Sequence, residues 1–254
     1  MSPYDCGFRG FRTAGKLIAG VNPALGKKGM GMRTISPRGR AEARRIIADF
    51  FAQRPDLAGC REPFEEAFRA AVACFRANRT LFLCGNGGSY ADCLHIGGEL
   101  FKTFERRRPL PAAHYKALKK DPYGKELADE IQAGFRAVPL GLNGSLVSAI
   151  LNDTNRADLH FAQELYVMGE KGDLLLAIST SGASRNVLNA MAVARVLGIR
   201  TIGLTGPAGG EVAKRADIAL RLPGSRARLA QESHLVCYHT LCLAIEAAFF
   251  PESG

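Results

Sequence analysis

The feature that most constrains the fold of this chain is an alternation that begins near residue 81. Short apolar runs end in turns rich in glycine or serine, and each turn opens a stretch with helical periodicity. Near-continuous apolar runs are typical of strands buried on both faces, as in a parallel sheet covered by helices. The runs are Leu81–Cys84, Val138–Leu142, Leu174–Ile178, Thr201–Leu204 and Ile218–Leu222. The sequence therefore predicts an α/β protein with a parallel sheet.

Helical patterns flank this alternation on both sides. After Ser36-Pro37, apolar residues recur at helical spacing in two segments, which predict an N-terminal helical hairpin. The two stripes consist of Ile46, Ile47, Phe50 and Phe51, and of Phe64, Phe68, Val72 and Phe75. At the other end, the pattern predicts one long helix from Ala230 to Phe250.

Residues 102–136 do not fit the alternation. The segment is polar and charged, but Leu127, Ile131 and Phe135 are spaced four residues apart. One interpretation is a solvated insertion with a single docked helix, and another is a lid or an oligomer contact. The sequence leaves these alternatives open.

The positive charge of the chain is concentrated near its N-terminus. Residues 1–45 contain ten Lys and Arg against two acidic side chains, so they account for +8 of the formal net charge of +10. The segment is also rich in glycine, and we predict that residues 1–38 are a flexible extension and that residues 39–254 form the folded domain. Alternatives are a nucleic-acid-binding arm, or an over-extended reading frame that truly starts at Met30 or Met32. Because the body carries little net charge, nucleic acid is not the expected partner.

Composition also indicates the compartment. No apolar run approaches the roughly 18 residues that a bilayer span needs, and no signal sequence follows Met1. The seven cysteines are an odd number without a Cys-x-x-Cys pair, which favours reduced thiols. We expect a cytoplasmic protein without a membrane partner.

Two loops are suited to an anion. Gly85-Asn86-Gly87-Gly88-Ser89 follows the first apolar run and precedes a helix, where glycines let a ligand approach the exposed backbone amides. It lacks the third glycine of a dinucleotide fingerprint and the Gly-Lys-Ser/Thr of a P-loop. The segment Ser179-Thr180-Ser181-Gly182-Ala183-Ser184 also joins a strand to a helix. Helix capping explains one of its hydroxyl groups, and the others predict a cradle of neutral donors for a sugar phosphate.

Two helices contribute acid–base groups. His95 and Glu99 are four residues apart, so they lie one turn apart on one helix face, where they could bind a metal ion or flank a reacting carbon. A surface hydrogen-bonded pair is the more ordinary explanation. On the C-terminal helix, His234 and His239 lie about 140° apart, so they do not face one site together. Helical periodicity aligns Glu232 with His239 better than it aligns Gln231 with His239. It does not settle which of the two residues shares a site with His239.

These motifs together resemble the sugar isomerase (SIS) domain, and more narrowly the phosphoheptose isomerases. The resemblance runs from about Arg40 to Phe250 and includes Asn152-Asp153. It implies a three-layer sandwich with a five-stranded parallel sheet between helices, an N-terminal helical hairpin, and a homotetramer with sites between subunits. The chain departs from the family in its longer insertion, its N-terminal extension, and Leu229-Ala230 ahead of Gln231 with Arg228 displaced by one position.

The resemblance also implies roles for individual residues. Glu99 would be the general base and His239 its acid partner, and a zinc ion, one per subunit, would be held by His95, Glu99, Gln231 and His239. The substrate phosphate would lie on Ser179, Thr180, Ser181 and Ser184. Contacts to the substrate are implied for Asn86, Gly87, Gly88, Ser89, Asn152, Asp153 and Gln231.

The reaction that these roles imply is an aldose–ketose isomerisation. It would convert sedoheptulose 7-phosphate to D-glycero-D-manno-heptose 7-phosphate through an enediol, with a base on carbon and an acid on oxygen. A non-catalytic SIS scaffold that binds a replication initiator is an alternative, which retention of Glu99 and His239 disfavours. An isomerase or lyase acting on another sugar phosphate is a second alternative.

Overall fold

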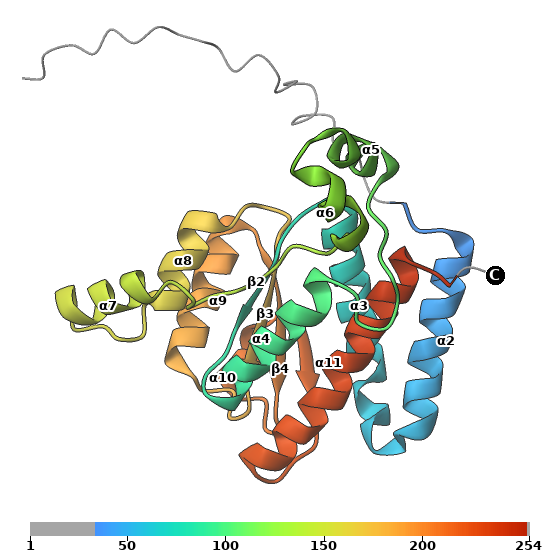
Figure 1. Ribbon diagram of the computed structural model, residues 1–254. Coiled ribbons are helices and arrows are strands. Elements are labelled where there is room, and N and C mark those ends of the chain that lie inside the picture. Colours follow the sequence, from blue (N-terminus) through green and yellow to red (C-terminus); the bar gives the residue numbers. More distant parts are fainter. Residues whose placement is uncertain (1–33, 253–254) are drawn as a thin grey trace, which may run out of the picture. The chain divides into compact units, whose positions relative to one another are not determined.

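The computed structural model describes residues 34–252 (Figure 1). The predicted flexible extension falls almost wholly outside the described residues, and its character stays a prediction. The helix α2 (Pro37–Gln53) begins where Ser36 Oγ accepts a hydrogen bond from the Gly39 amide at 3.0 Å, with proline in the first turn. The described helix thus starts two residues before the predicted domain boundary.

A single parallel sheet lies at the centre, with the strand order β2-β1-β3-β4-β5. The strands are β1 (Leu81–Cys84), β2 (Ala137–Pro139), β3 (Leu174–Ser179), β4 (Arg200–Thr205) and β5 (Ile218–Arg221). This confirms the predicted sheet. The predicted second strand was wrong in its extent, because a turn at Leu140 and Gly141, with a positive φ of 90° at the glycine, ends β2 at Pro139.

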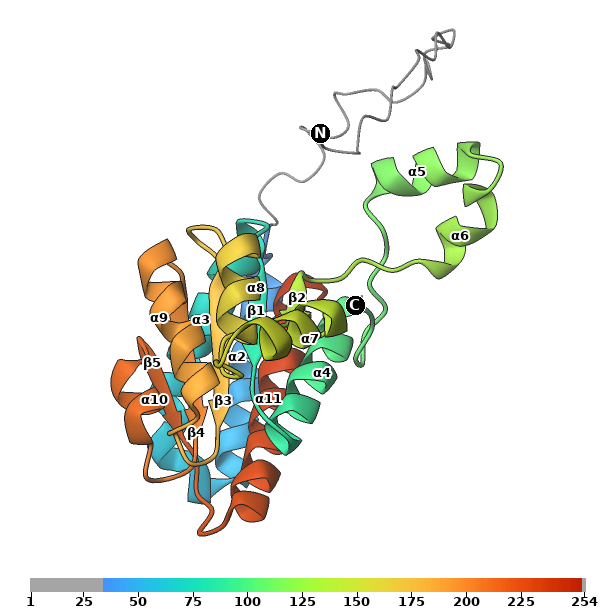
Figure 2. The same ribbon diagram turned by 90° about the vertical axis from the view of Figure 1, so that its left-hand side faces the viewer.

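Helices cover both faces of the sheet, which makes three layers (Figures 1 and 2). Leu81 and Leu83 point into one apolar core, and the alternate residues Phe82 and Cys84 point into the other. The first core is covered by α2, α3 (Arg61–Arg76), α4 (Gly88–Phe101) and α11 (Ala227–Phe249). The second is covered by α8 (His160–Met168), α9 (Arg185–Leu197) and α10 (Gly210–Arg215).

The remaining elements are η1 (Pro55–Cys60), α5 (Ala112–Lys120), α6 (Gly124–Glu130) and α7 (Gly144–Asp153). The predicted hairpin corresponds to α2 and α3, joined by η1, and α11 is the predicted C-terminal helix. Within residues 34–252, no helix combines the length and the apolar character that crossing a membrane requires. The six cysteines of the same part of the chain are all buried free thiols.

The insertion differs from the interpretation with one docked helix. It forms two helices, α5 and α6, which stand away from the three layers (Figure 2). The apolar stripe does not dock a helix: Leu127 and Ile131 are 47% and 45% exposed. Phe135 is buried, but it lies beyond the end of α6 at Glu130.

Candidate active site

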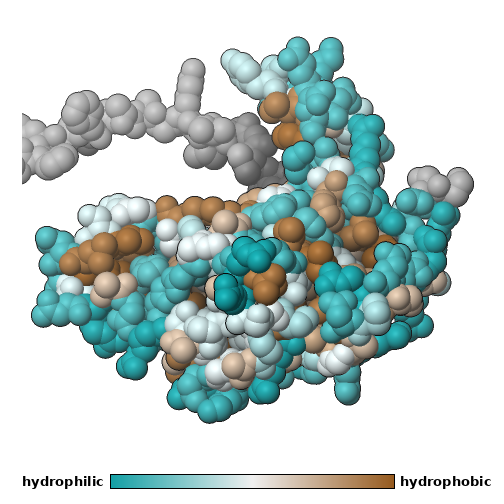
Figure 3. All heavy atoms as spheres, turned by 90° about the horizontal axis from the view of Figure 1, so that it is seen from below, coloured by the Kyte–Doolittle hydropathy of each residue, from teal (hydrophilic) through white to brown (hydrophobic). Residues whose placement is uncertain are grey.

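The two predicted anion loops lie at the same edge of the sheet, because both follow the carboxyl ends of parallel strands. One loop joins β1 to α4 and the other joins β3 to α9. This is the edge at which open α/β sheets bind ligands. Figure 3 looks onto this side of the molecule: polar side chains cover much of it, and hydrophobic side chains gather at the α7 end.

A pair of asparagines ties the two loops together. The side-chain amides of Asn86 and Asn186 exchange two hydrogen bonds of 2.8 Å. Asn86 was predicted to contact substrate, whereas Asn186 was missed. Its position two residues after Ser184, at the start of the same helix, was the available signal.

The hydroxyl-rich loop does not behave as an ordinary helix cap. Ser184 stands at the N-cap of α9, yet no side-chain cap bond forms there, and its Oγ lies 2.8 Å from Ser179 Oγ instead. The Val187 amide donates to Asn186 Oδ1 at 3.0 Å, so the Arg185 and Asn186 amides are those at the start of α9 that remain available to an anion. Gly182 adopts a positive φ of 65°, and a Cβ there would lie 1.9 Å from the Gly209 carbonyl oxygen, so only glycine fits this turn.

Three side chains converge between α4 and α11. His95 Nε2 lies 2.9 Å from Glu99 Oε1 and 3.5 Å from His239 Nε2. The Glu99 side chain is 16% exposed and that of His95 is 44% exposed, so the cluster faces solvent on one side. Burial lowers the pKa of His239 below its ordinary value, and the neighbouring His95 lowers it further, against the opposing effect of Glu99. His239 is therefore expected to be neutral at pH 7.

The donor atoms of this cluster fit a metal ion. One ligand atom each from His95, Glu99 and His239 lies within 4.8 Å of the others. Two imidazoles and a carboxylate are a donor set that zinc accepts, with further positions open to other ligands. The implied zinc site is therefore chemically reasonable for these residues, and zinc binding itself stays a prediction.

The polar side chains at the start of α11 point in different directions. The Gln231 amide lies against Gly88, where an added Cβ would come within 2.2 Å of Gln231 Nε2. Glu232 is exposed and pairs with Arg228 at 2.5 Å. His234 is fully buried, with no hydrogen-bond partner for either ring nitrogen among the described residues. Gln231, rather than Glu232, thus faces α4, although helical periodicity alone favoured Glu232.

Asn152 and Asp153 lie apart from this cluster. They are exposed at the end of α7, and Asn152 Nδ2 donates to Asp153 Oδ1 at 2.8 Å. Figure 1 shows α7 projecting from the side of the molecule opposite to α11. One subunit alone therefore does not bring these two residues to the cluster, and their contact with substrate stays a prediction.

Two sets of polar residues around the cluster were missed. Tyr238 contacts His95 and in turn donates to Asp92, and a buried pair, Arg108 and Glu246, fastens the C-terminal end of α4 to α11. Asp92 precedes His95 by three residues on α4, so helical spacing was an available signal for it. Arg108 and Glu246 are 138 residues apart, and no local pattern connects them.

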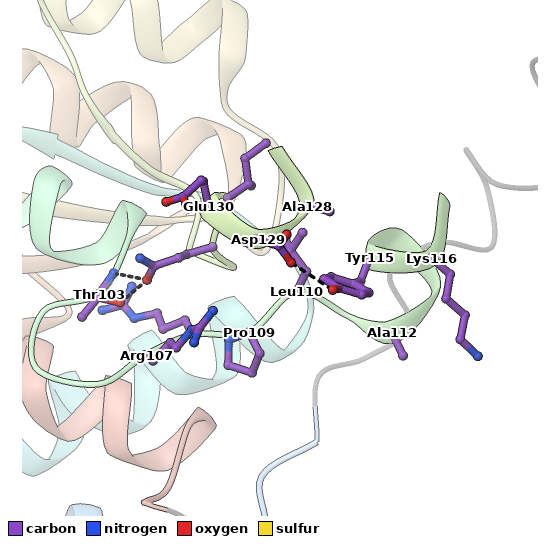
Figure 4. A pocket seen from close by; sticks show the side chains of 13 residues that line it. Thr103, Arg107, Pro109, Leu110, Ala112, Tyr115, Lys116, Ala128, Asp129 and Glu130 are labelled. Carbon is purple, nitrogen blue, oxygen red and sulfur yellow. Dashed lines mark hydrogen bonds between the residues drawn. The ribbon is translucent and has the colours of Figure 1, made fainter. Parts of the chain in front are cut away.

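A hollow beside the insertion is separate from the cluster. It has a volume of about 630 Å³ and lies between α5, α6 and the segment that leads into them, as Figure 4 shows. Tyr115 donates to Asp129 at 2.9 Å across it, and Thr103 contacts Gln132 at its inner end. His95, Glu99 and His239 are not among its lining residues.

Known proteins show the same fold and sequence pattern. Residues 156–249 match the SIS domain family. The phosphoheptose isomerase of Aliarcobacter butzleri is 36% identical over 206 residues, which cover 79% of this chain and 95% of that protein. That of Coxiella burnetii is 33% identical over 195 residues, covering 76% and 85%.

Solved structures agree. The phosphoheptose isomerase of Neisseria gonorrhoeae superposes with a TM-score of 0.58 at 28% identity, covering 81% of this chain and 94% of that one. The enzyme of Francisella tularensis gives 0.60 at 26% identity, covering 76% and 90%. The fold and these matches define a sugar-phosphate isomerase built on an SIS domain. The chain belongs to the phosphoheptose isomerase family, which confirms the resemblance drawn from its motifs.

Proposed function

We propose that this protein interconverts sedoheptulose 7-phosphate and D-glycero-D-manno-heptose 7-phosphate. The relatives named above support heptose phosphate as the substrate class. The observation that carries the proposal is the convergence of Glu99 and His239, from two different helices, on one partly open space. An isomerase that moves a proton between neighbouring carbons needs a base and an acid in this arrangement.

The loops supply the other end of the substrate site. The phosphate binds the amides at the start of α9 and the hydroxyl groups of Ser179, Thr180, Ser181 and Ser184. Asn86, Gly87, Gly88 and Ser89 contact the sugar, with Gln231 beside them. Gly88 precedes His95 by seven residues, about 10 Å along α4, so an extended sugar phosphate is suited to reach from the loops to the cluster.

The chemistry then follows from the cluster. The Glu99 carboxylate removes a proton from C1 of the ketose, and the electron pair forms the C1–C2 double bond of an enediol. His239 moves a proton between the two oxygens, and Glu99 returns its proton to C2, so that no net proton is gained or lost. A neutral imidazole suits this task, because it offers both an N–H donor and a lone pair.

A zinc ion would fit beside these groups. His95, Glu99 and His239 would hold it, and when bound it would polarise the substrate carbonyl and stabilise the enediolate. The Gln231 amide, also implied as a ligand, lies against Gly88 in this subunit, and its contact with the ion stays a prediction. Both roles of Glu99, ligand and base, draw on the same carboxylate.

We also propose a homotetramer in the cytoplasm. Large apolar side chains are exposed on α7 and α8, including Leu151, Tyr166 and Val167 at 57%, 62% and 73%. Exposed apolar surface of this kind is typical of contacts between subunits. Assembly would allow a neighbouring copy to bring Asn152 and Asp153 to the sugar.

Replacement of Glu99 by Gln tests the proposal. Turnover of sedoheptulose 7-phosphate should fall by about 10²- to 10⁴-fold, because the amide does not accept the carbon-bound proton. Substrate binding, measured by calorimetry, should persist because the phosphate loop is untouched.

The matched control is Glu232→Gln, which removes an exposed carboxylate on α11 outside the cluster and should leave turnover unchanged. Near-normal turnover in Glu99→Gln would show that the base is another group. A panel of ketose phosphates, assayed with and without a chelator, distinguishes the heptose from other sugar phosphates.

A further inference from the structure

Behind the cluster, the Tyr238 hydroxyl joins His95 to a carboxylate. The hydroxyl oxygen lies 3.0 Å from His95 Nδ1 and 3.2 Å from Asp92 Oδ1. Tyr238 is 2% exposed, so these contacts are shielded from water. Its ring also meets both histidine rings edge to face, with centroids 5.6 Å from that of His95 and 5.1 Å from that of His239.

The direction of these hydrogen bonds follows from the groups involved. An ionised carboxylate only accepts, so Tyr238 donates its single hydroxyl proton to Asp92. The hydroxyl oxygen is then left as an acceptor, and the His95 Nδ1–H donates to it. A neutral imidazole carries one N–H, so His95 Nε2 holds a lone pair.

Tyr238 matters to the carboxylate as well. Burial raises the pKa of Asp92, and the hydrogen bond from Tyr238 opposes that shift by favouring the charged form. The second oxygen, Asp92 Oδ2, is buried and has no hydrogen-bond partner among residues 34–252. The Tyr238 hydroxyl is therefore the donor on which this carboxylate depends. Burial also raises the pKa of Tyr238, so its hydroxyl keeps the proton that it donates.

The consequence appears on the other side of the ring. His95 Nε2 faces Glu99 Oε1 at 2.9 Å, and both atoms are acceptors when the carboxylate is ionised. Two acceptors at this distance repel each other unless a proton or a cation lies between them. The opposite tautomer would place an N–H on Nε2, close an ordinary hydrogen bond to Glu99, and block the space.

We propose that Tyr238, oriented by Asp92, is a positioning residue that holds His95 in the Nδ1–H tautomer, with its Nε2 lone pair directed into the cluster. This inference rests on the proposed function of the cluster and deepens it. A histidine whose other nitrogen is fixed by a hydrogen bond is a better-oriented and more basic ligand. Tyr238 thereby keeps the space between His95, Glu99 and His239 ready for a proton or a divalent cation.

The test uses the full chain labelled with ¹⁵N-histidine and the variant Tyr238→Phe, which keeps the aromatic ring and removes only the hydroxyl. At about pH 8, above the ordinary pKa of histidine, the ¹⁵N shifts of His95 report its tautomer directly. The signals are assigned by their loss in His95→Gln. We expect Nδ1–H in the native chain and a shift toward Nε2–H in Tyr238→Phe.

Two further readouts should follow the tautomer. Zinc affinity, measured by competition with a chromophoric chelator, should weaken by about ten- to a hundredfold in Tyr238→Phe, and kcat should fall within the same range while KM changes little. Ser233→Ala removes another buried hydroxyl of α11, whose Oγ donates only to the Leu229 carbonyl at 3.3 Å, and should change none of the three readouts.

An Nε2–H tautomer in the native chain would overturn the proposal, even if Tyr238→Phe did not fold. An unchanged tautomer in a folded Tyr238→Phe protein would do the same. Failure of the proposed function is seen separately, because Glu99→Gln tests turnover whereas the tautomer is read without substrate.

Discussion

Two polar clusters connect α4 to α11, and they differ in how they hold charge. Arg108 and Glu246 form an ion pair of 2.7 Å in which both side chains are 0% exposed. His95, Glu99 and His239 form a cluster that is open to solvent on one side. It brings two imidazole nitrogens and a carboxylate oxygen close together. Charges that are completely buried and satisfied serve structure, whereas charges left partly open are available to a ligand.

The buried pair is satisfied at almost every polar atom. The Arg108 guanidinium donates to Glu246 and also, at 2.8 and 2.7 Å, to the carbonyl oxygens of Leu100 and Glu99, which lie in the last turn of α4. The Glu246 carboxylate further accepts from three successive backbone amides, those of Phe104, Glu105 and Arg106. The pair therefore fixes the helix end from which the Glu99 side chain reaches the open cluster.

The largest expected effect comes from breaking the buried pair. Arg108→Met should lower the free energy of unfolding by about 3–5 kcal/mol, because it leaves the Glu246 carboxylate buried without its counter-charge. Urea unfolding at a fixed protein concentration measures this. A loss below about 1 kcal/mol would mean that the pair does not fasten the helices.

Two further variants show whether burial causes the effect. In Arg108→Met combined with Glu246→Gln, the uncompensated charge is gone while an oxygen still accepts from the backbone amides, so part of the stability should return. Lys119→Met breaks the partly exposed Lys119–Asp129 pair of the insertion and should lower stability far less than Arg108→Met does.

The next effect in size concerns the open cluster. If it binds a cation as proposed, Zn²⁺ at a hundred times its Kd should stabilise the protein by about 2.7 kcal/mol, and a chelator should reverse this. The rise in unfolding temperature measures it. With Zn²⁺ bound, the open cluster would be a second contact that holds α4 and α11 together.

The control compares two histidines. His239→Ala should abolish the stabilisation by zinc, whereas His160→Ala, on α8 and outside the cluster, should retain it. Equal stabilisation of both variants would place the zinc elsewhere and leave the cluster to proton transfer alone.

Local patterns were sufficient to predict the sheet and the site helices. Strand β1 was predicted at its observed bounds, because a short apolar run between polar segments has few other ways to be buried. His95 and Glu99 were placed on one face by spacing along a single helix. Such features depend on neighbours within a few residues.

The rest depends on contacts that no local pattern records. Arg108 looks in the sequence like one of three adjacent arginines on a solvated insertion, yet it is 0% exposed because Glu246 lies across the interface. Tyr238 precedes a predicted catalytic histidine, but its role depends on Asp92 of another helix. The direction of Gln231 likewise follows from how α11 packs on Gly88, and not from helix periodicity.

The smallest expected effect concerns His234 of α11, which is buried like Arg108, but whose ring nitrogens have no hydrogen-bond partner within residues 34–252. Burial lowers its pKa, and the nearby Thr205 backbone, which forms no hydrogen bond of standard geometry with the ring, offsets this only in part. The unfolded chain therefore binds a proton more readily than the folded protein. Stability should fall as the pH drops through the ordinary histidine pKa of about 6.5, and level off below the folded value.

His234→Leu isolates this contribution. The apolar side chain should leave stability at pH 8 equal or higher, because no buried ring nitrogen then lacks a hydrogen bond. Between pH 8 and pH 5 the variant should lose less stability than the native chain, as measured by urea unfolding at each pH. Subtracting one curve of stability against pH from the other cancels the contributions of all the other titrating groups, including those of the open cluster. If stability falls with pH to the same extent in both proteins, burial does not hold His234 neutral. A buried polar group on α11 would then be tolerated without the hydrogen bonds that satisfy Arg108.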